Sequence, residues 1–109
     1  MESLHVDQLQ AFVAAHPGTV LLDVREPWEV ALARIELPGT TALNIPMQQI
    51  PARLAQIDGT QPVVCICHHG ARSAQVVAFL QRQGLDPVYN LAGGVDAWST
   101  LVDAAVPRY

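Results

Sequence analysis

One short stretch of the sequence gathers the residues best suited to nucleophilic chemistry. Cys67 ends an apolar run, and the residues that follow it are His68, His69, Gly70, Ala71 and Arg72. A loop of this kind between a strand and a helix can turn successive backbone N–H groups toward the sulfur, and the helix dipole favours negative charge there. Arg72 adds a positive charge, so these surroundings favour the thiolate, the nucleophilic form of cysteine. We therefore predict that Cys67 is a nucleophile and that the five residues after it bind an anionic substrate.

The elements that position this loop can be predicted from the hydrophobic pattern. Apolar runs at residues 19–23, 63–67 and 88–91 each follow a proline or a Pro-Gly pair and predict strands. The first two runs do not alternate apolar and polar residues, as expected of parallel strands that are covered on both faces. Helical periodicity is present at residues 6–15, 27–34, 47–57, 73–83 and 95–101. Strands that alternate with helices predict an α/β fold around a mainly parallel sheet.

Each predicted strand is followed by a polar or glycine-bearing turn. Asp23 and Arg25 follow the first strand, Cys67 ends the second, and Gly93-Gly94 follows the third. In open α/β sheets, ligands bind beyond the carboxyl ends of the strands, so these turns should meet at one edge. We expect Asp23 to form a structural ion pair or turn cap. Arg25 is a candidate either for support of the loop or for contact with the substrate.

The composition argues against several other kinds of protein. The 109 residues are half apolar and carry a net charge of −4, which predicts one compact domain over residues 1–109 rather than a disordered chain. No apolar run reaches the roughly 18 residues of a membrane span, and no basic block points to a nucleic-acid partner. The N-terminal residues do not resemble a secretory signal, so we expect a cytoplasmic protein whose two cysteines stay thiols. We expect neither a cofactor nor a metal.

Four segments follow one another in the order typical of a known family. They read LLDVRE at residues 21–26, LPGT at 37–40 followed by NIP at 44–46, VVCICHHGARS at 63–73 and LAGGVDAW at 91–98. With these motifs the sequence resembles the rhodanese-like sulfurtransferases over nearly its whole length.

The resemblance implies both a fold and an activity. The fold would be rhodanese-like, with a small central, mainly parallel sheet flanked by helices on both faces. The activity would be that of a thiosulfate sulfurtransferase-like enzyme, in which Cys67 takes a sulfane sulfur from a small anionic donor such as thiosulfate. The persulfide would then pass its sulfur to cyanide or a thiol, a protein thiol included. By the same resemblance, the backbone of residues 68–72 stabilises the persulfide and Arg72 helps to bind the donor. We expect a monomer or a weak dimer.

Two other functions would use the same nucleophile. Cysteine-dependent phosphatases and arsenate reductases resemble one another in placing an arginine six positions after the cysteine, whereas Arg72 lies five positions after Cys67. The shorter loop should fit a sulfur atom better than a phosphoryl group. A partner-directed persulfide carrier needs the same cysteine and the same loop, and steady-state turnover of thiosulfate and cyanide distinguishes it from an enzyme.

A metal or dithiol site is the third alternative, built from Cys65, Cys67 and the two histidines. Structural zinc sites usually have two to four residues between paired cysteines, and here one residue intervenes. We expect Cys65 to be a small core residue. Trp28 and Trp98 are expected to complete the core or to cover the loop.

Overall fold

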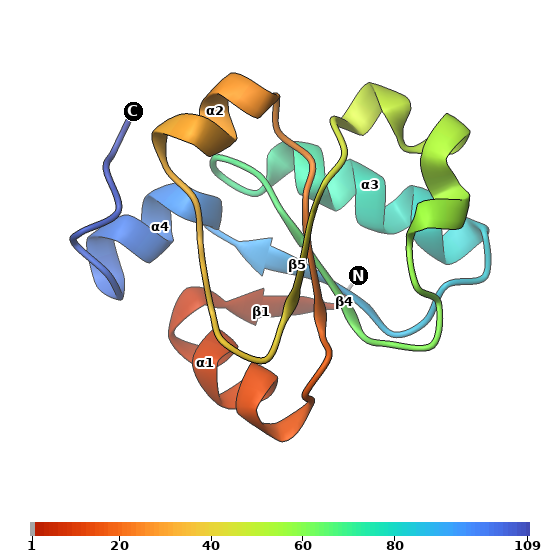
Figure 1. Cartoon of the computed structure of the whole chain (residues 1–109), viewed down its shortest axis with the longest axis horizontal. Coiled ribbons are helices and arrows are strands. Elements are labelled where there is room, and N and C mark those ends of the chain that lie inside the picture. The colour runs from red at the N-terminus through yellow and green to blue at the C-terminus, as the bar shows by residue number, and fades with distance from the viewer. Residues whose placement is uncertain (1) are drawn as a thin grey trace.

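A parallel sheet of five strands lies at the centre of the molecule (Figure 1). The computed structural model describes residues 2–109, and the strand order across the sheet is β1-β5-β4-β2-β3. The strands are β1 (Ser3–His5), β2 (Val20–Asp23), β3 (Thr41–Asn44), β4 (Val63–Ile66) and β5 (Val88–Ala92). The helices are α1 (Val6–Ala15), α2 (Pro27–Leu32), α3 (Ala71–Arg82) and α4 (Gly94–Leu101), with two 3-10 helices, η1 (Met47–Gln49) and η2 (Pro51–Gln56).

Two apolar layers cover the two faces of the sheet. On one face, α3 and the segment around η1 and η2 pack over Leu22 and Cys65. On the other face, α1 and α4 pack over Leu21 and Val64. Neighbouring residues of β2 and β4 are thus buried on opposite faces, which explains their continuous apolar runs. The predicted α/β fold, with a parallel sheet flanked by helices on both faces, is confirmed.

The structure differs from the sequence prediction at the edges of the sheet. β1 and β3 were not predicted, because both are short edge strands whose side chains are largely exposed and carry no apolar run. The helix predicted at residues 47–57 is wrong: this segment forms η1 and η2 instead. Pro51 begins η2 and has no backbone N–H to donate, so a continuous α-helix would lose a hydrogen bond there.

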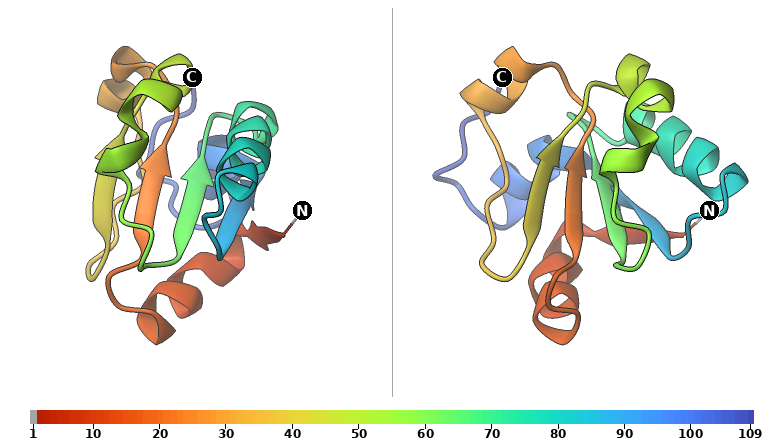
Figure 2. Two further views of the ribbon diagram at one scale, coloured as in Figure 1. Left: turned by 90° about the vertical axis from the view of Figure 1, so that its right-hand side faces the viewer. Right: turned by 45° about the vertical axis from the view of Figure 1, so that its right-hand side comes forward.

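The carboxyl ends of the strands point to one end of the molecule, where α2 lies (Figure 2). The turns after β2, β4 and β5 meet there as predicted: the N–H of Val24 donates to Ile66 O, and that of Val95 donates to Cys67 O. Trp98 is buried in the core, as expected, whereas Trp28 is 62% exposed and is not part of the core. None of the helices within residues 2–109 has the length and apolar character needed to cross a membrane.

Candidate active site

Cys67 directly follows β4 and begins the turn that leads into α3. Its Sγ accepts a hydrogen bond from the N–H of Gly70 at 3.0 Å and lies 3.2 Å from the hydroxyl oxygen of Ser73. Gly70 has a φ of +109°, a conformation that side chains resist. Cys67 is 1% exposed, so the loop folds closely around the sulfur. Gly70 therefore supplies one of the inward N–H groups that the sequence predicts.

The N-terminus of α4 fixes the other side of this loop. The N–H groups of Val95 and Asp96 donate to the carbonyl oxygens of Cys67 and His68, each at 3.0 Å. Gly94 makes this approach possible, since a Cβ atom on it would lie 2.3 Å from the oxygen of Cys67. Because N–H and C=O point in opposite directions across a trans peptide, the N–H groups of His68 and His69 point away from α4. Within residues 2–109 neither of these N–H groups has an acceptor, so both can serve a bound anion.

Arg72 forms a bidentate ion pair with Glu29 of α2. Its two terminal nitrogens donate to the two carboxylate oxygens at 2.8 Å each. Hydrogen bonding to Arg72 lowers the pKa of the nearly buried Glu29 to about 2, and the same contact raises the pKa of Arg72. The positive charge predicted to attract a donor is therefore largely compensated within the protein. The Arg72 side chain remains 36% exposed, so contact with a donor stays a prediction.

Arg25, the second candidate for substrate contact, is fully buried. Its guanidinium donates twice to the carboxylate of Asp23, at 2.9 and 2.7 Å, and once to the carbonyl oxygen of Ala33 at 2.7 Å. Its remaining terminal nitrogen, Nη1, donates to Tyr109 Oη at 2.7 Å. Asp23 forms the structural ion pair that was expected. Nη1 also donates to the carbonyl oxygen of Glu29 at 3.3 Å, so all five N–H groups of Arg25 have acceptors in the protein, and contact of Arg25 with a substrate stays a prediction.

Tyr109 reaches the site from the far end of the sequence. Its hydroxyl accepts the hydrogen bond from Arg25 and donates to Glu29 at 3.0 Å. Its ring stacks on His68, with centroids 4.0 Å apart and an interplanar angle of 9°. Figure 1 shows the C-terminal end of the chain beside α2. Tyr109 and Glu29 were not predicted from the sequence. Tyr109 contacts Glu29 across 80 residues and Glu29 contacts Arg72 across 43 residues, so no local pattern indicates either contact.

The two histidines of the loop differ in their surroundings. His68 lies between the rings of Tyr109 and His69, and its buried Nε2 has no partner among residues 2–109. Burial, together with the neighbouring His69, lowers the pKa of His68 and so disfavours the protonated ring. His69 is 66% exposed and its Nδ1 lies 3.9 Å from a carboxylate oxygen of Asp96. His69 thus belongs to the solvent-facing rim of the loop.

Cys65 lies in the sheet interior and is fully buried. Burial raises the pKa of its thiol to about 12, with a smaller contribution from Cys67. Both cysteines are free, and Cys65 packs in the apolar layer beneath α3, as expected of a small core residue. In the part of the chain that the structure describes, no group of three or more His, Cys, Asp or Glu side chains is placed to hold a metal ion.

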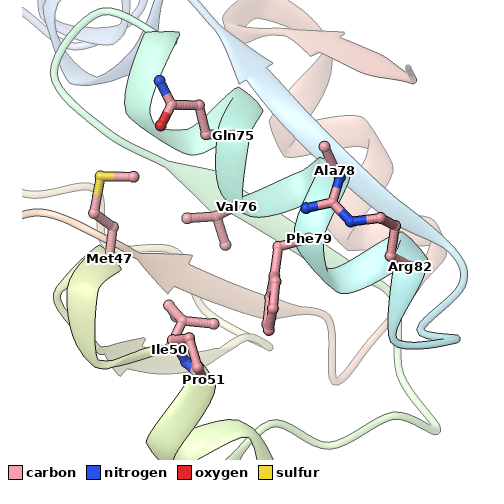
Figure 3. A pocket seen from close by; sticks show the side chains of 8 residues that line it. All are labelled: Met47, Ile50, Pro51, Gln75, Val76, Ala78, Phe79 and Arg82. Atoms are coloured by element: carbon pink, nitrogen blue, oxygen red, sulfur yellow. The ribbon is translucent and has the colours of Figure 1, made fainter.

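Cys67 does not line the hollow beside α3. A hollow of about 420 Å³ lies between α3 and the η1–η2 segment (Figure 3). Met47, Val76 and Phe79 line it, and none of the residues 67–72 does. The site around Cys67 is instead a tight backbone loop with a rim formed by His69 and the partly exposed Arg72.

Comparison with known proteins shows the family to which the chain belongs. Residues 5–101 match the rhodanese-like domain family. The chain is 39% identical over 93 residues to a protein named sulfurtransferase from Allochromatium vinosum, over 85% of this chain and 83% of that one. It is 33% identical over 89 residues to thiosulfate sulfurtransferase GlpE from Stutzerimonas stutzeri, over 82% and 78%. A crystal structure of a rhodanese-like domain protein from Staphylococcus aureus superimposes with a TM-score of 0.78 at 34% identity, covering 90% of this chain and 91% of that one. The chain belongs to the rhodanese-like domain family.

Proposed function

We propose that this protein is a sulfurtransferase in which Cys67 carries the transferred sulfur as a persulfide. The observation that carries the proposal is the position of the Cys67 sulfur, which lies at a strand end within hydrogen-bonding distance of the Gly70 N–H. The N–H groups of His68 and His69, which have no acceptor among residues 2–109, lie in the same loop and would bind negative charge. The relatives named as sulfurtransferases, one of them a thiosulfate sulfurtransferase, support the same reaction class.

The reaction is a double displacement. The Cys67 thiolate attacks the sulfane sulfur of a donor such as thiosulfate, a new S–S bond forms, and sulfite leaves with the electron pair of the broken S–S bond. The outer sulfur of the persulfide then carries the negative charge. Cyanide or a thiolate attacks this outer sulfur in the second step, and Cys67 leaves as the thiolate. A covalent intermediate of this kind gives ping-pong kinetics.

Local groups must attract an anionic donor, because the protein as a whole is acidic, with a net charge of −4. Glu29 compensates much of the charge of Arg72. We therefore assign most of the binding of the donor to the backbone N–H groups of residues 68–72, with Arg72 contributing through its exposed edge. The open rim suits acceptors that cannot enter a deep pocket, including the cysteine of another protein.

The test is the intact mass of the protein after incubation with thiosulfate. We expect a gain of one sulfur atom, about 32 Da, that cyanide removes, because the intermediate is covalent. Cys67→Ser should not gain this mass, whereas Cys65→Ser should gain it as the wild type does. A labelled Cys67→Ser protein would overturn the proposal. Labelling without steady-state turnover of thiosulfate and cyanide would identify the protein as a persulfide carrier rather than an enzyme.

A further inference from the structure

A pair of buried polar side chains lies behind the Cys67 loop on the side of α3 and β5, and one of the two contacts the Cys67 sulfur. Ser73 is fully buried in the first turn of α3, and Asn90 of β5 is 8% exposed. Ser73 Oγ lies 3.2 Å from Cys67 Sγ and is hydrogen-bonded to Asn90 Oδ1. Asn90 Nδ2 in turn donates to the carbonyl oxygen of Gly70 at 3.2 Å. These contacts form a closed ring around the start of the loop.

The direction of every hydrogen bond in this ring follows from the Gly70 carbonyl. A carbonyl oxygen can accept but cannot donate, so the amide nitrogen of Asn90 must face Gly70 and the amide oxygen must face Ser73. The amide oxygen also can only accept, and the Ser73 hydroxyl therefore donates to it. The Gly70 carbonyl, 3.3 Å from Ser73 Oγ, is the other acceptor for the same hydrogen. Both acceptors draw this hydrogen away from Cys67.

The sulfur consequently faces a lone pair of the Ser73 oxygen. A thiol can donate its S–H to that oxygen. A thiolate can only accept, so with the hydroxyl hydrogen on Asn90 the sulfur and the Ser73 oxygen would face each other as two acceptors 3.2 Å apart. The thiolate gains a donor from Ser73 when the hydroxyl hydrogen rotates from Asn90 toward the sulfur. Solvent offers little substitute, because Cys67 is 1% exposed. The Gly70 N–H favours the thiolate, so the two neighbours of the sulfur act in opposite directions.

We propose that Asn90 is a positioning residue that competes with the Cys67 thiolate for the hydroxyl hydrogen of Ser73. When the thiol proton leaves for water or a buffer base, the Ser73 hydroxyl turns to the sulfur and its bond to Asn90 is lost. The inference rests on the proposed role of Cys67 as the nucleophile. It adds that the readiness of this nucleophile is set by a pair of neutral side chains behind the loop as well as by the loop itself.

The test is the pH dependence of the rate at which iodoacetamide alkylates Cys67, with the site of reaction located by mass spectrometry. Ser73→Ala removes the donor that the thiolate gains as well as the weaker acceptor of the S–H group, and we expect the midpoint of the profile to rise by about half a unit to one unit, the effect of one hydrogen bond. A fall or an unchanged midpoint would overturn the proposal, because the thiolate would then not compete for the Ser73 hydrogen.

A second pair of variants tests whether Asn90 acts through Ser73. Asn90→Leu removes the acceptor that holds the hydroxyl hydrogen, and the thiolate should then compete successfully for it, because the Gly70 carbonyl already accepts the N–H of Ala74. We expect a lower midpoint in Asn90→Leu than in the wild type, and no shift from Asn90→Leu in a protein that already carries Ser73→Ala. Equal shifts with and without the Ser73 hydroxyl would show that Asn90 acts by another route and would refute the relay.

Ser99→Ala is the matched control. Ser99 is also a buried serine, 5% exposed, but its hydroxyl donates to the carbonyl of Val106, away from the loop. Its loss should leave the alkylation midpoint unchanged. Alkylation does not require sulfur transfer, so a failure of the relay and a failure of the proposed function are separate results: the first appears in the pH profile and the second in the mass after thiosulfate.

Discussion

Cys65 and Cys67 lie two residues apart on the same face of the sheet, and both are almost completely buried. Cys65 is in the middle of β4, where its surroundings are apolar and burial keeps its thiol protonated. Cys67 lies one residue beyond the strand, where Gly70 and Ser73 contact its sulfur. The comparison teaches that burial alone does not make a cysteine inert. What differs is whether hydrogen-bonding groups replace the solvent that burial removes.

Substitution of each of the two cysteines in turn should give the largest contrast. Cys67→Ser should abolish sulfur transfer, since a hydroxyl cannot form the persulfide, with little change in the melting temperature. Cys65→Ala should keep the activity and lower stability by about 1 kcal/mol, the effect of a small core deletion. Steady-state rates and thermal melts measure both effects. Sulfur transfer that survives in Cys67→Ser and disappears in Cys65→Ala would reverse the assignment of the nucleophile.

Gly94→Ala should disrupt the surroundings of Cys67 while leaving those of Cys65 intact. The added Cβ would lie 2.3 Å from the Cys67 oxygen and 2.5 Å from the His68 oxygen, so α4 and the loop must separate. We expect activity to fall at least tenfold and stability to fall by about 3 kcal/mol. The matched control is Gly59→Ala, because a Cβ there meets no atom within 4 Å. Equal activity and stability in Gly94→Ala and Gly59→Ala would contradict the close approach of α4 to the Cys67 loop.

Arg72→Ala should show how much the ion pair at the loop contributes to stability. The variant leaves the nearly buried Glu29 carboxylate without its cation, which costs about 2–4 kcal/mol. Adding Glu29→Gln should recover part of the loss, because an amide needs no cation. Urea unfolding of the two single variants and the double variant forms the required cycle. Additive effects would mean that the pair contributes little. Thiosulfate KM, measured on the folded variants, separates binding of the donor from stability.

The same ion pair predicts a dependence of stability on acid. The pKa of Glu29 is about 2 in the folded protein, below its ordinary value of 4.5. A lowered folded pKa stabilises the protein at pH values above the unfolded pKa, and this contribution is lost as the pH falls from about 4.5 toward 2. We expect a loss of about 1–3 kcal/mol over this range after allowing for solvent screening. Glu29→Gln should flatten this part of the unfolding profile, and an unchanged slope would contradict the assignment.

Tyr109→Phe should have the smallest effect of these changes. The variant keeps the ring that stacks on His68 and removes the hydroxyl that joins Arg25 to Glu29. We expect a loss of about 1 kcal/mol and a small decrease in activity, measured by thermal melts and thiosulfate turnover. Tyr109→Leu also removes the stacking and should lower both the melting temperature and the thiosulfate turnover further. Equal values for the two variants would show that the ring contributes nothing.

The sequence predicted the parts of the molecule that depend on neighbouring residues. Long apolar runs identified β2, β4 and β5, and a cysteine at a strand end followed by Gly70 and Arg72 identified the loop. β1 and β3 were missed because short edge strands owe their existence to pairing with a partner strand and not to their own pattern. Pro51 lies inside residues 47–57 and disfavours one continuous helix over this range.

The polar support of the site could not be predicted in the same way. That Arg72 pairs with Glu29, and that Tyr109 joins Glu29 to Arg25, depends on how distant segments are brought together at the sheet edge. The sequence showed the cation of the loop without its partner, and so it predicted more attraction for an anionic donor than the paired charges provide. Ser73 was visible as the residue after Arg72, but its role depends on Asn90 across the sheet.

The ion pair between α2 and α3 has a further consequence for the motions of the molecule. α2 has six residues, too few for a helix that persists alone in water, and Glu29 ties it to Arg72 and Tyr109. Backbone amides of α2 should therefore exchange with deuterium in a shared opening event with the Cys67 loop. A sulfur bound at Cys67 that steadies the loop would slow this exchange. Occupancy of the site could then be followed from amides that never touch the substrate.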